Sequence, residues 1–178
     1  MSGKKKAPGR SSAKVEVEAP ASAQSAAERK SAEGELSSLV EKYAPDHQRL
    51  VASMRKSLQE RLPTAHEVVY EYANQGAVVI SYSPNEHGYA GVLAIRVSED
   101  GVKLYFTQGK DLPDPEKWLK GSAQTRWIEV EAASTLTRPA VVSLINDALA
   151  RNRAPFAPDG RGSMVIRSTS AKKKRKPD

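Results

Sequence analysis

The stretch EVVYEYANQGAVVISYS at residues 67–83 decides the fold, because its hydrophobic pattern differs from that of the residues before it. In its first half, Val68, Tyr70 and Tyr72 recur at every second position, which is the period of a β-strand. Asn-Gln-Gly at 74–76 is a turn signal, and the apolar run at 77–83 is typical of a second strand. The stretch therefore predicts two strands joined by a short turn.

Three more strands follow. Residues 89–97 predict the third and residues 102–107 the fourth, with the Asp-Gly hairpin signal at 100–101 between them. A longer connection at 109–125 leads to a fifth strand at 126–131. Short turns join the first four strands, and a parallel crossover needs a dozen or more residues, so the pattern predicts an antiparallel meander.

The hydrophobic period is helical on both sides of these strands. Apolar residues recur three and four positions apart at 36–43, 50–58 and 141–149. Pro45 separates the first two helices, Pro63 ends the second, and Pro139 lies in the first turn of the last. The sequence predicts an α+β single domain, a mainly antiparallel sheet of about five strands with two N-terminal helices and one C-terminal helix packed on one face.

Both ends of the chain differ in composition from the middle. Residues 1–31 have almost no large apolar side chains, so they predict a disordered basic tail before a domain at 32–156. Residues 157–178 predict a basic C-terminal tail. The apolar triplet at 164–166 either adds one extra edge strand at 164–167 or belongs to that tail.

The chain has 178 residues and a formal net charge of +7, which its two ends carry. Residues 1–31 hold seven Lys or Arg against three Glu, and residues 154–178 hold seven against two Asp, whereas residues 32–153 hold fourteen against sixteen acidic residues. A basic face over the whole domain is therefore not predicted. The two basic tails are either solubilising or make sequence-independent contacts to nucleic-acid phosphates, and the candidate contact residues form the C-terminal run. Its residues are Lys172, Lys173, Lys174, Arg175 and Lys176.

The composition excludes several classes of protein. The chain contains no cysteine, which excludes a disulfide-stapled secreted fold and thiolate chemistry. Its longest apolar runs are too short for a transmembrane helix or for the apolar part of a signal peptide. We therefore expect no membrane partner and a cytoplasmic location.

Residue patterns that carry chemistry are missing. The phosphate-binding patterns G-x-x-x-x-G-K-[ST] and G-x-G-x-x-G and the nucleophile pattern G-x-S-x-G do not occur, so no enzymatic activity is predicted. The histidines His47, His66 and His87 lack metal-ligand spacing and are predicted at the surface. A metal site shared by the His-Glu pair at 66–67 and the Glu-His pair at 86–87 would require two loop ends to meet.

Five tyrosines on or beside the predicted strands form a candidate ligand face. A sheet with helices on one side leaves its other side available to a planar ligand or a protein partner, and alternation could place several tyrosines there. Core packing or self-association explains the same pattern. The leading hypothesis is a non-enzymatic binding or accessory module of unknown ligand. The five residues are Tyr70, Tyr72, Tyr82, Tyr89 and Tyr105.

The segment Leu-Tyr-Phe-Thr-Gln-Gly-Lys-Asp-Leu-Pro-Asp-Pro at 104–115, with Leu-Lys-Gly-Ser at 119–122, resembles the YdhG-like family of bacterial domains of unknown function. Leu-Pro at 62–63, Arg-Pro-Ala-Val at 138–141 and Gly-Arg-Gly at 160–162 extend the resemblance to roughly residues 36–170. It implies a small α+β cytoplasmic domain. Some members are described as frataxin-like intracellular iron chaperones, so iron handling is an alternative function, with no metal-binding residues assigned.

Overall fold

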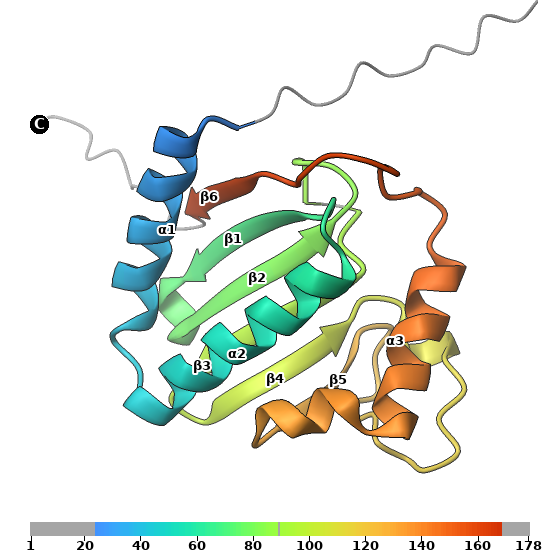
Figure 1. Cartoon of the computed structure of the whole chain (residues 1–178). Coiled ribbons are helices and arrows are strands. Elements are labelled where there is room, and N and C mark those ends of the chain that lie inside the picture. The colour runs from blue at the N-terminus through green and yellow to red at the C-terminus, as the bar shows by residue number, and fades with distance from the viewer. Residues whose placement is uncertain (1–23, 89, 169–178) are drawn as a thin grey trace, which may run out of the picture.

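Six strands form one sheet in the computed structural model, which describes residues 24–88 and 90–168 (Figure 1). The strands are β1 (His66–Tyr72), β2 (Ala77–Ser83), β3 (Leu93–Ser98), β4 (Gly101–Phe106), β5 (Arg126–Val130) and β6 (Met164–Ser168). They lie in the order β5-β4-β3-β2-β1-β6. The first five form an antiparallel meander, and β6 pairs in parallel with β1.

This topology confirms the α+β prediction, with six strands rather than about five. The sixth, β6, is the edge strand suggested at 164–167. Its approach to β1 depends on Gly162, because a Cβ atom there would overlap with the backbone carbonyl of Ala65. The close approach lets Glu67 N donate to Ser163 O at 2.9 Å and Gly162 N to Pro63 O at 3.1 Å. Residues 164–168 thus form part of the sheet.

The strand register places one apolar residue of each strand in a single row under the helices. Side chains alternate between the two faces of a strand, so residues that are paired across the sheet point the same way. Burial of apolar surface is the dominant favourable contribution to folding, and this row is part of the buried core. The row consists of Ile166, Val69, Ile80, Ile95, Leu104 and Ile128.

Three helices cover this apolar face: α1 (Ala26–Val40), α2 (Pro45–Arg61) and α3 (Pro139–Arg151). Figure 1 shows α2 lying across the sheet, with α1 beside β6 and α3 on the side of β4 and β5. In the described residues, none of these helices is long and apolar enough to cross a membrane. Their buried residues are Ala32, Leu36, Val40, Val51, Met54, Leu58, Val141, Leu144, Ile145 and Ala148.

Helix α1 begins within the segment 1–31 that was predicted to be disordered. Ser25 and Glu28 form a capping box, in which each side chain accepts a hydrogen bond from the backbone N–H of the other, at 3.1 and 2.8 Å. The side chain of Gln24 also exchanges two hydrogen bonds with the backbone of Met164, at 2.8 and 2.9 Å. These local and distant contacts order a segment with few large apolar side chains.

Candidate functional site

A polar cluster lies under α2 at the β1 side of the sheet, with Glu67 at its centre. Arg55 of α2 donates to both carboxylate oxygens of Glu67, at 2.9 and 3.0 Å, and to both oxygens of Glu33 of α1, at 2.9 and 3.0 Å. Glu67 also accepts from Gln59 Nε2 at 2.7 Å and from the Tyr82 hydroxyl at 3.0 Å. Glu67 is only 4% exposed. We call these five residues the Glu67 cluster.

Pairing and burial set the ionisation of this cluster. Burial by itself would lower the pKa of Arg55, but its hydrogen bonds to Glu67 and Glu33 raise that pKa above the ordinary value. The hydrogen bond from Arg55 in turn lowers the pKa of Glu33. Burial raises the pKa of Tyr82 well above its usual range. The cluster therefore links α1 and α2 to the sheet through hydrogen bonds that hold both carboxylates.

The structure corrects the prediction that the His-Glu pair at 66–67 lies at the surface, since His66 is 7% and Glu67 4% exposed. His66 Nδ1 accepts a hydrogen bond from the backbone N–H of Ser163 at 3.0 Å, and it lies 4.0 Å from Glu86 Oε1. Burial lowers the pKa of His66, and the nearby Glu86 carboxylate opposes that effect. The His-Glu pair at 66–67 and the Glu-His pair at 86–87 thus approach each other through His66 and Glu86. His87, in contrast, is exposed.

No group of three or more His, Asp or Glu side chains in the described part of the chain is placed to hold a metal ion. Iron handling remains a prediction that rests on the family resemblance.

The predicted tyrosine face is divided between the two sides of the sheet. Tyr70 and Tyr72 lie on the side without helices, which we call the open face, with their ring centroids 6.1 Å apart. On the same face, Tyr105 stacks on Trp127, with centroids 5.6 Å apart. The inclusion of Tyr82 was wrong, because alternation along β2 directs it to the helix-covered face, where it is 1% exposed.

Two further predictions lie outside the described residues. One is Tyr89, and the other is the C-terminal run of Lys172, Lys173, Lys174, Arg175 and Lys176.

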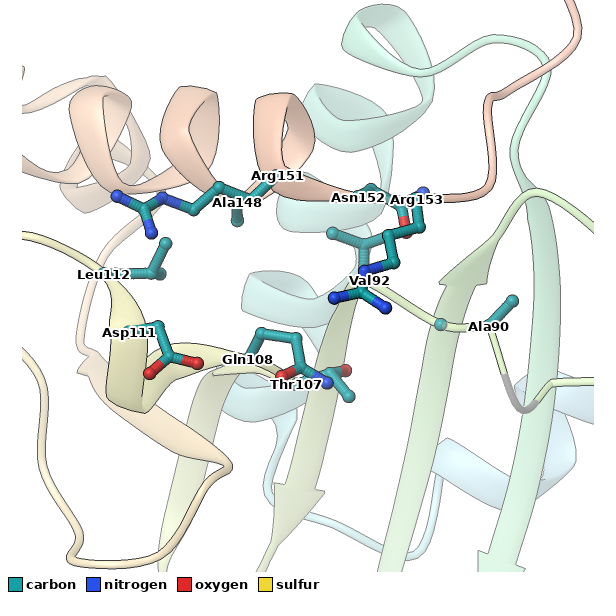
Figure 2. Close-up of a pocket in the computed structure, with 11 residues that line it drawn as sticks. Ala90, Val92, Thr107, Gln108, Asp111, Leu112, Ala148, Arg151, Asn152 and Arg153 are labelled. Carbon is teal, nitrogen blue, oxygen red and sulfur yellow. The ribbon is translucent and has the colours of Figure 1, made fainter.

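A cavity of about 620 Å³ opens between the end of α3 and the turn that follows β4 (Figure 2). This turn contains the short helix η2 (Gly109–Asp111). The floor of the cavity is apolar: Val92, Leu112 and Ala148 line it, and each keeps an exposure of 7 to 8%. A ligand seated there would cover apolar surface that the fold leaves accessible to water.

Two arginines extend from the end of α3 into this cavity. Arg151 is the last residue of α3 and Arg153 follows two residues later. Figure 2 shows Arg153 directed down into the space above Gln108, and Arg151 extending along α3 with its guanidinium above Leu112. Neither guanidinium forms a hydrogen bond, or an ion pair within 4.0 Å, with any residue that the structure describes. Asp111, the acidic residue of the described lining, instead accepts a hydrogen bond from Gln124 at 3.1 Å. The lining therefore carries two cations against one anion.

Sequence reasoning did not single out Arg151 or Arg153. A cation in the last turn of a helix is the ordinary complement of the helix dipole, so its presence there carries no functional signal. The two residues become a candidate site only because the turn after β4 lies beneath the end of α3.

No model of a protein family matches the chain, and neither the curated proteins nor the solved structures contain a match to it. The membership in the YdhG-like family that the sequence suggests accordingly remains a prediction. The arrangement of the side chains around the cavity at the end of α3 is therefore the basis for a functional proposal.

Proposed function

We propose that the chain is a non-enzymatic binding module, and that the cavity between α3 and η2 takes a small molecule with an anionic group on an apolar body. The observation that supports this proposal is the pair of unpartnered arginines, Arg151 and Arg153, above an apolar floor. A guanidinium matches the oxygens of a carboxylate or phosphate with two parallel hydrogen bonds. The apolar floor would bury the body of the same ligand, as is usual in small-molecule sites.

Binding explains the lining better than catalysis does. General acid–base or nucleophilic catalysis needs a titratable group within reach of a reacting atom, and usually a nucleophile beside its base. In the described lining, Thr107 supplies a hydroxyl but no histidine accompanies it, and Asp111 accepts a hydrogen bond from Gln124. The remaining polar groups, on Gln108 and Asn152, can orient a ligand by hydrogen bonds.

The proposal can be tested with three probes that share one aromatic body: phenyl phosphate, benzoate and uncharged benzyl alcohol. Isothermal titration calorimetry with the full chain would measure each affinity. We expect at least one of the two anions to bind at least about tenfold more tightly than the alcohol, because a charge-assisted hydrogen bond contributes about 1.5–3 kcal/mol. The comparison between the two anions identifies the preferred acid. Inorganic phosphate should bind more weakly than phenyl phosphate, because it leaves the floor uncovered.

Variants locate the binding. Arg151→Gln and Arg153→Gln should each weaken the binding of the preferred anion by about tenfold and leave the binding of benzyl alcohol unchanged. Arg138→Gln is the matched control, since it removes the same charge from the other end of α3. The proposal is wrong if neither anion binds at concentrations on the order of millimolar, or if Arg138→Gln weakens binding as much as the two cavity variants do.

A further inference from the structure

On the open face, the strand register lines up the side chains of all six strands in rows. Two adjacent rows cross the whole sheet, from β6 at one edge to β5 at the other. The first row is Arg167, Tyr70, Val79, Arg96, Lys103 and Glu129. The second row is Val165, Val68, Ser81, Ala94, Tyr105 and Trp127.

The aromatic side chains of this face are gathered at two places. One pair, Tyr70 and Tyr72, lies on β1, and the other, Tyr105 and Trp127, lies on β4 and β5. All four side chains are half-buried, so part of each ring remains accessible to solvent. Three strand spacings, about 14 Å, separate β1 from β4. The residues between the pairs have smaller side chains: Val79 and Ala94 are half-buried, whereas Ala77, Ser81 and Ser98 are buried.

The same face carries three cations, Arg96, Lys103 and Arg167, of which Arg167 donates a hydrogen bond to the backbone oxygen of Glu86 at 2.9 Å. Arg96 pairs directly across the strands with Lys103, and like charges in that position destabilise a sheet. Lys103 Nζ lies 5.4 Å from the centroid of the Trp127 ring. The acidic residue in the described strands of this face is Glu129, which lies opposite Lys103 and forms an ion pair with Lys120 at 2.7 Å, so these strands carry three cations against one anion. An anion bound at Arg96 and Lys103 would relieve their repulsion.

We infer that the open face binds single-stranded nucleic acid, with bases stacked on the two aromatic pairs and phosphates at Arg96, Lys103 and Arg167. Aromatic side chains on an open antiparallel sheet stack two or three bases, and the faces of the bases are free for this only in a single strand. A protein partner with an acidic surface would use the cations but would leave the spaced aromatic pairs unexplained. This surface is separate from the cavity at α3, so the inference stands independently of the proposed function.

The chain carries more positive charge beyond the described residues. The run Lys172 to Lys176 begins four residues after Ser168, the last residue of β6. Such a run adds contacts to phosphates, which do not depend on the base sequence and do not distinguish a single strand from a duplex. The aromatic pairs, in contrast, would distinguish a single strand from a duplex. This difference separates the contribution of the face from that of the C-terminal cations.

The experiment uses the full chain with Trp118→Phe, which leaves Trp127 as the fluorescent reporter of the face, because the sequence contains two tryptophans. A short oligouridylate and the duplex that it forms with oligoadenylate are titrated at low and at physiological salt. We expect saturable quenching of Trp127 by the single strand, with an affinity at least about fivefold higher than that for the duplex. Equal affinities, or binding of the single strand without quenching, would overturn the inference.

Variants in the same background separate charge from stacking. Arg96→Gln/Lys103→Gln should weaken single-strand binding and reduce the slope of log affinity against log salt by about 1.4, since each lost phosphate contact removes about 0.7. Tyr105→Leu should weaken binding about fivefold or more and leave that slope unchanged. Circular dichroism checks that each variant is folded.

The matched control is Lys30→Gln/Lys56→Gln, which removes two exposed cations from α1 and α2 and should keep the affinity of the parent. A version in which Lys172 to Lys176 are replaced by serine should bind more weakly but keep its preference for the single strand. The inference fails if the Arg96/Lys103 variant behaves like the matched control, or if the serine version loses the preference for the single strand.

Discussion

Arginines at two sites of the molecule have opposite surroundings. On the β1 side of the sheet, Arg55 directs its four hydrogen bonds to the carboxylates of Glu33 and Glu67, and its side chain is largely buried. At the end of α3, Arg151 and Arg153 are exposed and lack an acidic partner within 4.0 Å in the described residues. Both sites use a cation that projects from a helix, yet only the first neutralises it within the fold.

The difference follows from desolvation. A buried guanidinium without partners would lose its hydration with nothing in return, so Arg55 is tolerated only together with its carboxylates. Water satisfies Arg151 and Arg153, so the fold does not need to pair them. A cation that the fold does not need is free to bind a ligand, and the concave apolar surface beside these two arginines supports the proposal that they do so.

The largest effect is expected from breaking the paired site. Arg55→Met removes the cation and leaves the carboxylate of Glu67 buried without its main donor, so the free energy of unfolding should fall by about 3–5 kcal/mol. Urea denaturation of the variant and the parent measures this change. The double variant Arg55→Met/Glu67→Gln removes the uncompensated charge and should lose less than the single variant. Additive losses would show that the two side chains are not coupled.

A smaller loss is expected at the edge strand next to this site. Gly162→Ala places a Cβ atom against the backbone carbonyl of Ala65, which is not free to move like the end of a side chain. The variant should lose about 1–3 kcal/mol and exchange the β6 amide hydrogens faster, as measured by hydrogen exchange. Gly34→Ala in α1, where nothing lies within 4 Å of the added atom, is the control and should gain stability instead. Unchanged exchange in β6 would contradict this role of Gly162.

Acidification should weaken the same edge through His66. Its pKa is lowered by burial, so the native state binds fewer protons than the unfolded chain, and its contribution to stability is present above the usual pKa of histidine. That contribution is lost as the pH falls through the lowered pKa, because protonated Nδ1 can no longer accept the hydrogen bond from Ser163. The slope of this contribution is at most about 1.4 kcal/mol per pH unit.

The measurement is urea unfolding at neutral and at mildly acidic pH. His66→Asn keeps a side-chain acceptor but does not titrate, so the difference between this variant and the parent isolates histidine from the carboxylates. The same pH dependence in both proteins would count against the prediction.

The smallest effect is expected at the unpaired arginines. Arg151→Ala and Arg153→Ala should each change the free energy of unfolding by less than about 0.5 kcal/mol, because these side chains are exposed and make no ion pair in the described structure. Thermal denaturation of the two variants and the parent without ligand measures this change, which can then be compared with the loss expected for Arg55→Met. A loss of several kcal/mol would mean that the fold, and not a ligand, requires these residues.

Most of the fold could be predicted because hydrophobic period is a local property. The alternation at 67–83 predicted β1 and β2, and the helical stripes predicted the later part of α1 and all of α2 and α3. The start of α1 was missed because its stability comes from the capping box at Ser25 and from Gln24, which contacts Met164 far away in the sequence. The site was predicted only in part: Tyr70, Tyr72 and Tyr105 lie on the open face, whereas Tyr82 and Glu67 are buried under the helices.

By itself, the sequence determined most of the elements and the antiparallel order of the first five strands, since these depend on backbone geometry and on neighbours a few positions away. Only the tertiary structure decided which charges are neutralised and which remain available. Arg55, Arg96 and Arg151 have the same side chain but different surroundings. Arg55 is paired with two carboxylates, Arg96 lies opposite a lysine of the neighbouring strand, and Arg151 borders a cavity. Their surroundings come from residues distant in the sequence, and electrostatic free energy depends on distance in space.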